Sequence, residues 1–114
     1  MSIFLRKPSG HIEAVIDEDG GLNTFYEVAY ILNKEYKVKF INKNDEFDTI
    51  VWDFRFRRHS LSLHYNIYSG VSIISLPSKY SVEKDNKVVK ELSIFLQTRL
   101  ENRKLQNKND VAVA

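Results

Sequence analysis

Two neighbouring stretches of the chain alternate between apolar and polar residues, and this pattern constrains the fold more than any other feature. In residues 49–57 every second residue is a large apolar one, and residues 60–68 alternate in the same way. Successive side chains of a strand point to opposite faces, so each stretch is predicted to be a strand with one buried face. The two strands are predicted to form a hairpin around Arg58-His59.

Matching the apolar faces of this hairpin predicts its register. The expected cross-strand pairs are Phe56 with Leu61, Phe54 with Leu63, Trp52 with Tyr65, Ile50 with Ile67, and Arg55 with Ser62. On the polar face this register places Asp53 opposite His64. A carboxylate is thus predicted to face an imidazole on the solvent side of the sheet.

Other periodic segments flank the hairpin. Strands are predicted at 11–17, 37–41 and 71–76, a polar turn at 42–46, and helices from residue 22 or 24 to 34 and over 82–104. Thr24 with Glu27 fits a capping box for the first helix, and Ser81 offers an N-cap for the second. The order β-α-β-β-β-β-α predicts an α+β fold, in which an antiparallel sheet of about four to five strands carries two helices on one face.

Length and composition predict one domain. The chain has 114 residues, of which 43% are hydrophobic, and it contains no cysteine. Residues 1–104 are predicted to form the domain and residues 105–114 a flexible tail. The absence of cysteine excludes disulfides, cysteine-based zinc sites and a thiol nucleophile. No apolar stretch approaches the ~20 residues needed to cross a bilayer, so we expect no membrane association and a cytoplasmic location.

Charge is distributed unevenly along the chain. The formal net charge is +2, but residues 1–53 carry 6 Lys/Arg against 10 Asp/Glu, whereas residues 54–114 carry 11 against 5. The first half is therefore acidic and the second half basic. Such a division favours docking to another protein over a uniformly basic nucleic-acid surface.

Catalytic motifs are not found in the sequence. Its four glycines do not form a phosphate-binding loop, and there is no nucleophile elbow or zinc-binding helix. The spacing of Glu13, Asp17 and Asp19 does not fit a calcium loop. We therefore predict no enzyme, no catalytic residue, no metal and no cofactor.

The predicted polar face of the hairpin is the strongest constellation of chemically active residues. Asp53 with His64, beside Arg55 and Arg57, could act as a general acid–base pair on a phosphodiester, which suggests a small nuclease or an accessory domain as the alternative function. The simpler interpretation is that opposite charges pair across a solvent-exposed sheet. Aromatic and arginine side chains lie on opposite faces, which argues against nucleic-acid binding.

Two acidic loops are candidates for binding a partner. They are Asp17-Glu18-Asp19 and Asp45-Glu46-Phe47-Asp48. Their charge would speed association with a basic protein surface, and an aromatic residue such as Phe47 or Tyr68 would supply buried contact. The alternative is that these loops are solvated turns.

The plan of strand, helix, antiparallel meander and closing helix across residues 11–104, with abundant Asn, Lys and Ile, resembles the small immunity proteins encoded beside bacterial contact-dependent growth inhibition toxins. The resemblance implies a cytoplasmic inhibitor that binds and neutralises a cognate toxin, foremost a nuclease domain, at its active site or an adjacent exosite. Immunity proteins against basic nucleases tend to be acidic overall, whereas this chain is mildly basic.

The candidate binding residues therefore combine the acidic loops with the polar hairpin face. They are Asp17, Glu18, Asp19, Asp45, Glu46, Phe47, Asp48, Asp53, Arg55, Arg57, His64 and Tyr68. A homodimer is a further option, because the predicted strand 71–76 has apolar residues on both faces and leaves a strip to be covered.

Overall fold

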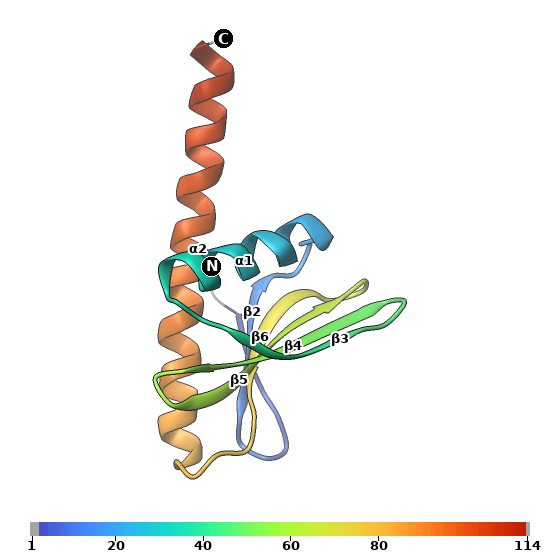
Figure 1. Ribbon diagram of the computed structural model, residues 1–114, viewed down its shortest axis with the longest axis vertical. Helices are drawn as coiled ribbons and strands as arrows, with labels where there is room; N and C mark the ends of the chain where they lie inside the picture. Colours follow the sequence, from blue (N-terminus) through green and yellow to red (C-terminus); the bar gives the residue numbers. More distant parts are fainter. Residues whose placement is uncertain (1–2, 114) are drawn as a thin grey trace.

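The computed structural model contains one six-stranded antiparallel sheet with both helices on the same face (Figure 1). It describes the backbone of residues 3–113 and the side chains of residues 3–105. The strands are β1 (Ile3–Arg6), β2 (Ile12–Asp17), β3 (Phe40–Asp45), β4 (Thr49–Phe56), β5 (His59–Asn66) and β6 (Gly70–Ser75). The helices are α1 (Leu22–Glu35) and α2 (Val82–Val113). The α+β class with two helices is therefore confirmed.

The sheet has more strands than expected and an order that brings distant segments together. Its order is β1-β2-β6-β5-β4-β3, with every neighbouring pair antiparallel. The first residues add strand β1, which pairs with β2. Residues 42–45, expected as a turn, continue β3 instead, because they pair with β4 as far as Asp45. Strands β6, β5 and β4 lie between β2 and β3 in the sheet. The chain therefore passes from β2 to the distant edge strand β3 through helix α1.

The predicted hairpin exists, but its register is shifted by two residues. Phe54 pairs with Leu61 and Phe56 with His59, so the turn is Arg57-Arg58 and not Arg58-His59. A shift of two residues leaves every side chain on its predicted face, because the side-chain period of a strand is two. Asp53 consequently pairs with Ser62 and not with His64.

The helix ends differ in part from the expected ones. Helix α1 begins after Gly21 without a side-chain cap, so the predicted capping box of Thr24 and Glu27 does not form. In α2 the predicted N-cap is confirmed, since the Ser81 hydroxyl accepts a hydrogen bond from the Lys84 amide at 3.2 Å. Helix α2 also continues nine residues beyond the expected end at residue 104, to Val113.

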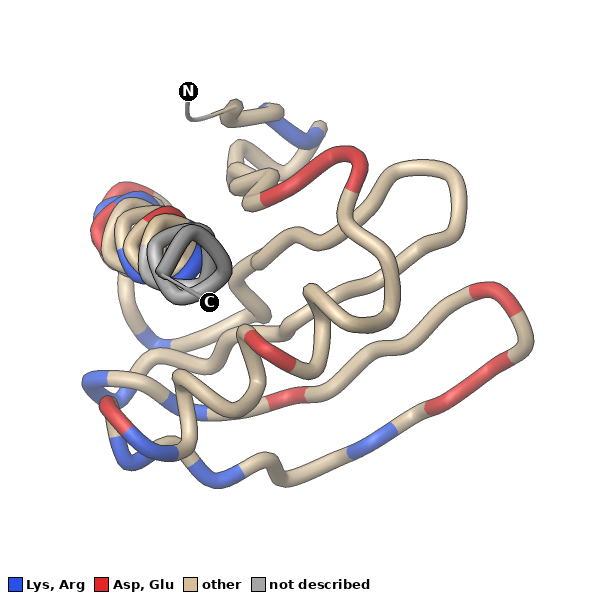
Figure 2. The backbone as a smooth tube through the Cα atoms, turned by 90° about the horizontal axis from the view of Figure 1, so that it is seen from above, with Lys and Arg blue, Asp and Glu red and all other residues tan. Residues whose placement is uncertain are grey.

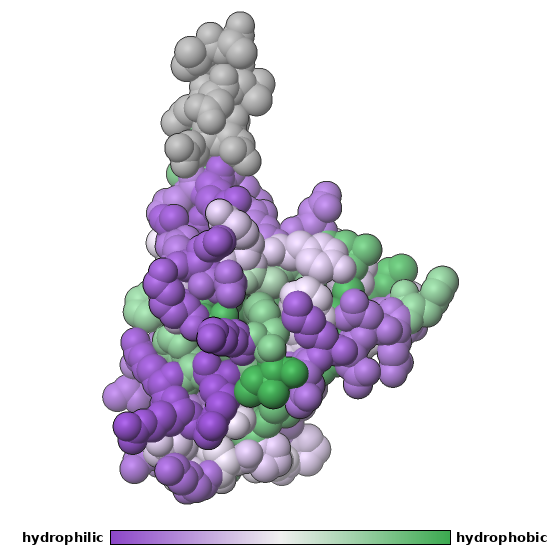
Figure 3. All heavy atoms as spheres, in the orientation of Figure 1, coloured by the Kyte–Doolittle hydropathy of each residue, from purple (hydrophilic) through white to green (hydrophobic). Residues whose placement is uncertain are grey.

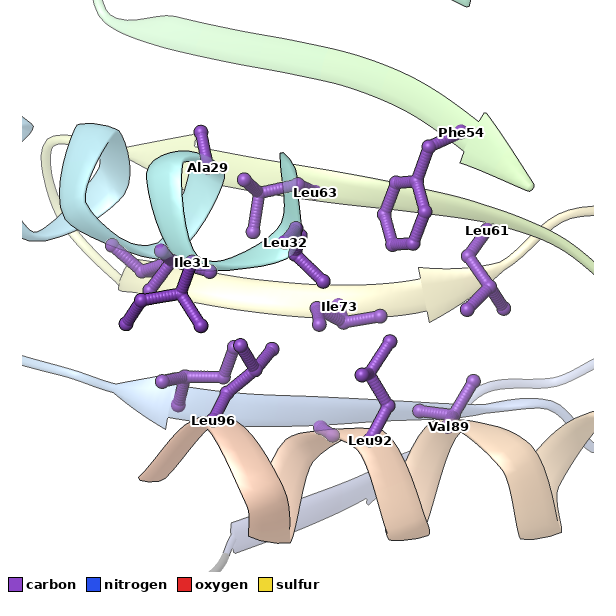
Figure 4. Close-up of a cluster of buried hydrophobic side chains, with 14 of the residues drawn as sticks. Ala29, Ile31, Leu32, Phe54, Leu61, Leu63, Ile73, Val89, Leu92 and Leu96 are labelled. Atoms are coloured by element: carbon purple, nitrogen blue, oxygen red, sulfur yellow. The ribbon is translucent and has the colours of Figure 1, made fainter. Parts of the chain in front are cut away.

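The hydrophobic core lies between the sheet and the two helices. Figure 4 shows side chains of α1 and α2 directed toward the same strands, with Leu32, Ile73 and Leu92 among those at the centre. These three side chains are fully buried. Core residues alternate along the hairpin, at Ile50 and Phe54 of β4 and Leu61 and Leu63 of β5, which confirms the predicted inner face there. Ile67, also expected on that face, lies beyond the end of β5 and is exposed. The opposite face of the sheet carries no helix among the described residues.

Within the described part of the chain, no helix is both long and apolar enough to cross a membrane.

Candidate functional site

Three connections meet at one end of the sheet and bring the two acidic loops together. They are the loop from β2 to α1, the β3–β4 turn and the β5–β6 turn. We call these three connections together the acidic end. The Ile67 amide donates to the carbonyl of Asp48 at 3.1 Å, and the Asn66 side-chain amide donates to the Thr49 hydroxyl at 3.2 Å. These bonds hold the β3–β4 and β5–β6 turns side by side.

Gly70 holds the remaining loop against the β5–β6 turn. It has a φ of +81°, and a Cβ atom placed on it would lie 2.1 Å from the carbonyl oxygen of Asp17. Only glycine combines this backbone conformation with so close an approach of two chain segments. The loop carrying Asp17, Glu18 and Asp19 is therefore packed beside the turn that carries Tyr68.

The carboxylates of the acidic end form no ion pairs within residues 3–105, and Lys43, which lies nearby, is placed over the Trp52 ring at 4.3 Å. The six carboxylates are those of Asp17, Glu18, Asp19, Asp45, Glu46 and Asp48. Several are instead bound by neutral donors, such as the Trp52 indole, which donates to Asp45 at 2.7 Å. In Figure 2 the acidic segments of these loops lie at the top and right and most of the basic ones at the lower left, with single basic segments also drawn near the acidic ones.

Exposed apolar side chains accompany this charge. Phe47 in the β3–β4 turn is 103% exposed and Tyr68 in the β5–β6 turn 87% exposed, with Ile67 beside it also exposed. In Figure 3 hydrophobic residues reach the surface at the right-hand strand ends, next to hydrophilic ones. Large apolar side chains in such positions gain free energy when a partner covers them.

Arg55 and Arg57, predicted to belong to the same surface, lie at the other end of the strands. Arg57 is in the β4–β5 turn, where it forms an ion pair with Glu91 of α2 at 2.8 Å and lies over the Phe56 ring. Arg55 lies near the end of β4 on the open face of the sheet. The structure therefore divides the predicted residues between two ends.

Asp53 and His64 occupy the middle of the open face but are not hydrogen-bonded to each other. The two oxygens of Asp53 accept bonds from the Ser62 hydroxyl at 2.9 Å and the Asn42 amide at 3.5 Å. His64 pairs with Val51 and Ser72 across the strands. The acid–base pair expected from the sequence is thus not assembled, because the hairpin register places Ser62 opposite Asp53.

Burial shifts the proton affinity of two groups on this face. It lowers the pKa of His64, although the carboxylates of Glu13 and Asp53 act in the opposite direction. Burial alone would raise the pKa of Glu13. Hydrogen bonds from Ser72 at 2.6 Å and from Lys7, with the charge of Lys7 at 2.9 Å, outweigh burial and leave that pKa below its usual value.

A buried carboxylate at the start of α2 was not identified from the sequence. Asp85 is 1% exposed and contacts His59 Nδ1 at 2.7 Å and His11 Nε2 at 3.5 Å. It also accepts from the Ser78 hydroxyl at 3.0 Å, and the His59 ring stacks on Tyr80. His11 and His59 thus connect the β1–β2 turn and β5 to α2. The N-cap predicted at Ser81 marked the start of α2 but did not indicate that Asp85 is buried.

Within residues 3–105 no group of three or more His, Asp or Glu side chains is placed to hold a metal ion. Comparison of the chain with protein-family models, curated proteins and solved structures finds no match.

Proposed function

We propose that the chain is a protein-binding inhibitor whose acidic end docks onto a basic cleft of a cognate toxin domain. The observation that carries the proposal is the gathering of six carboxylates around the exposed Phe47 and Tyr68, none of them in an ion pair among residues 3–105. Charge of one sign steers association, and exposed aromatic side chains supply contact that becomes buried. A nuclease is the class of toxin that fits best, because its substrate-binding cleft must be positively charged to hold phosphates.

The acidic end also answers the objection raised by the net charge. Partner approach depends on the local field and not on the total, because charges more than about 10 Å apart in solvent are largely screened at moderate ionic strength. The basic residues that make the total positive lie mainly at the other end and along α2. A mildly basic protein can therefore present an acidic docking surface.

The test is a binding measurement with the toxin-like product of the neighbouring reading frame. We expect a one-to-one complex by calorimetry and loss of the toxicity or nuclease activity of that product. A chain that forms no such complex and neutralises nothing contradicts the proposal.

Matched variants locate the surface. Glu46→Lys at the acidic end is expected to slow association about tenfold, while Glu83→Lys, an equal charge change at the opposite end, leaves the rate nearly unaltered. Phe47→Ala is expected to speed dissociation by about tenfold or more. Equal effects of the two charge reversals would place the interface elsewhere.

A further inference from the structure

Three cationic side chains line a shallow hollow at the end of the sheet opposite to the acidic end. Arg55 from β4, Arg58 from the β4–β5 turn and Lys79 from the β6–α2 loop surround a volume of about 460 Å³, which we call the cationic hollow. No carboxylate of residues 3–105 lines it. None of the three forms an ion pair among residues 3–105, although Arg57 beside them does. The charges that repel one another here are therefore unpaired within the described chain.

The loop that carries Lys79 is held in place by the groups around it. The Leu76 amide donates to the carbonyl of Ser60 at 2.8 Å, which ties the loop to β5. On the other side, the Ser78 hydroxyl donates to buried Asp85 and accepts from the Tyr80 amide at 3.1 Å. Lys79 lies between these anchored residues. Its backbone is thus positioned beside the hairpin even though its side chain is exposed.

The turn that carries Arg58 has an unfavourable backbone conformation. Arg57 and Arg58 have φ values of 51° and 68°, in the left-handed region where Asn and Gly are the usual residues of two-residue hairpin turns. Arg57 makes contacts within the chain that stabilise its position, to Glu91 and the Phe56 ring. No comparable contact involves the Arg58 side chain within residues 3–105. Strain retained without an internal contact is typical of residues that serve a binding site.

We propose that the cationic hollow binds a phosphate group. Guanidinium groups present planar pairs of donors that match phosphate oxygens, and two of them with an ammonium group provide three positive charges for a ligand carrying about two negative ones. Free nucleotides and the backbone of nucleic acids both supply this chemistry. The proposal does not rest on the proposed function, because it uses the opposite end of the sheet.

The test is a titration of the full chain with inorganic pyrophosphate, followed by the shifts of backbone amide signals in NMR spectra. We expect saturable shifts confined to residues 55–60 and 77–80. Arg58→Gly should weaken binding about tenfold, since one charged contact is lost, while glycine accepts the positive φ and keeps the fold. Arg57→Gly changes the same turn but leaves the three hollow residues, and should bind as the parent does.

A second titration distinguishes the two sources of phosphate. A short single-stranded oligonucleotide that binds at the same residues more tightly than pyrophosphate would identify a nucleic-acid backbone as the ligand. Weaker binding of the oligonucleotide would identify a free phosphate ligand. The proposal is overturned if pyrophosphate causes no saturable shift, if acetate causes the same shifts, or if the two glycine variants lose binding equally.

Discussion

The two ends of the sheet differ in how their aromatic side chains and charges are combined. At the acidic end Phe47 and Tyr68 are exposed, and no cation pairs with the six carboxylates among the described residues. At the opposite end Arg57 lies over the Phe56 ring and Lys79 near the Tyr80 ring. Beside the acidic end Lys43 also lies over a ring, that of Trp52, which donates to Asp45, but within residues 3–105 no cation lies over Phe47 or Tyr68. Exposed rings amid one sign of charge suit burial against a protein, whereas rings covered by cations leave a charged surface to a solvated anion.

The ends also differ in what holds their loops. At the acidic end the backbone of one loop rests directly on Gly70, so the arrangement depends on the absence of a side chain. At the opposite end the buried carboxylate of Asp85 contacts His11 and His59 and accepts a hydrogen bond from Ser78. We therefore expect the acidic end to be destabilised by adding a side chain at Gly70, and the opposite end by removing the side chain of Asp85.

The largest effect is expected from Gly70→Ala. A methyl group would lie 2.1 Å from the Asp17 carbonyl oxygen, and the φ of +81° is unfavourable for alanine. We expect a loss of about 3 kcal/mol or more in the free energy of unfolding, measured by urea denaturation. Gly21→Ser is the control, because no described residue other than its two chain neighbours has an atom within 4 Å of the added Cβ, and serine is a good N-cap. Equal stability of Gly70→Ala and the parent would contradict the packing described here.

Asp85→Ala is expected to disturb the other end. It removes the carboxylate that contacts both the buried His59 ring and the half-buried Ser78 hydroxyl, and leaves both without this partner. The expected loss is about 2–3 kcal/mol in the free energy of unfolding. Because Ser78 precedes Lys79, the variant should also weaken binding of pyrophosphate. Asp85→Asn retains an acceptor oxygen and is expected to lose less stability; a larger loss than for alanine would contradict this account.

The two-residue period of side chains along a strand explains why the sequence predicts the faces of the hairpin but not its register. Alternation in residues 49–68 places Asp53 and His64 on the open face correctly, since any even shift of register keeps the faces. It does not distinguish a turn at Arg57-Arg58 from one at Arg58-His59, because two arginines carry no turn signal of the Asn-Gly kind. The pairing of Asp53 with His64 was wrong for this reason.

The assembly of both ends depends on contacts between residues far apart in the chain. The two acidic loops are evident in the sequence, but their shared location follows from the position of β6 between β2 and β5. Asp85 is at a position where an acidic side chain also suits the positive end of a helix dipole. Its burial comes from His11, 74 residues earlier, and from His59 in β5. No local pattern distinguishes these two roles.

A smaller effect is expected from relieving the strain in the β4–β5 turn. Arg58→Gly removes an unfavourable left-handed arginine and no ion pair of the described residues, so the free energy of unfolding should rise by about 0.5–1 kcal/mol. Arg57→Gly should raise the free energy of unfolding by a smaller amount, because the exposed ion pair with Glu91 is lost. Thermal denaturation of both variants beside the parent measures this difference. A lower stability of Arg58→Gly would show that its side chain makes a stabilising contact.

The smallest effect concerns the middle of the open face, between the two ends, where burial lowers the pKa of His64 beside Glu13, Asp53 and Lys7. The folded imidazole binds a proton less tightly than the unfolded one, whose pKa is about 6.5. As the pH falls below about 6.5, the unfolded state binds a proton before the folded state does. The free energy of unfolding therefore decreases until the pH reaches the lowered pKa of the folded chain. Glu13 acts in a lower range: its folded pKa is also lowered, so its contribution is present above 4.5 and lost at more acid pH.

His64→Gln removes the first of these contributions, whereas the hydrogen bonds from Ser72 and Lys7 that lower the pKa of Glu13 remain. We expect the difference in the free energy of unfolding between pH 7 and about pH 5.5 to shrink by a few tenths of a kcal/mol in the variant, measured by urea denaturation. Ser72→Ala is the matched variant, because it removes the hydrogen bond to Glu13. The change in its free energy of unfolding between pH 7 and about pH 5.5 should equal that of the parent. The same pH dependence in His64→Gln and the parent would show that the imidazole is as solvated in the folded chain as in the unfolded one. The open face would then be a third exposed polar surface, and the distinction between the two charged ends and a partly buried centre would no longer hold.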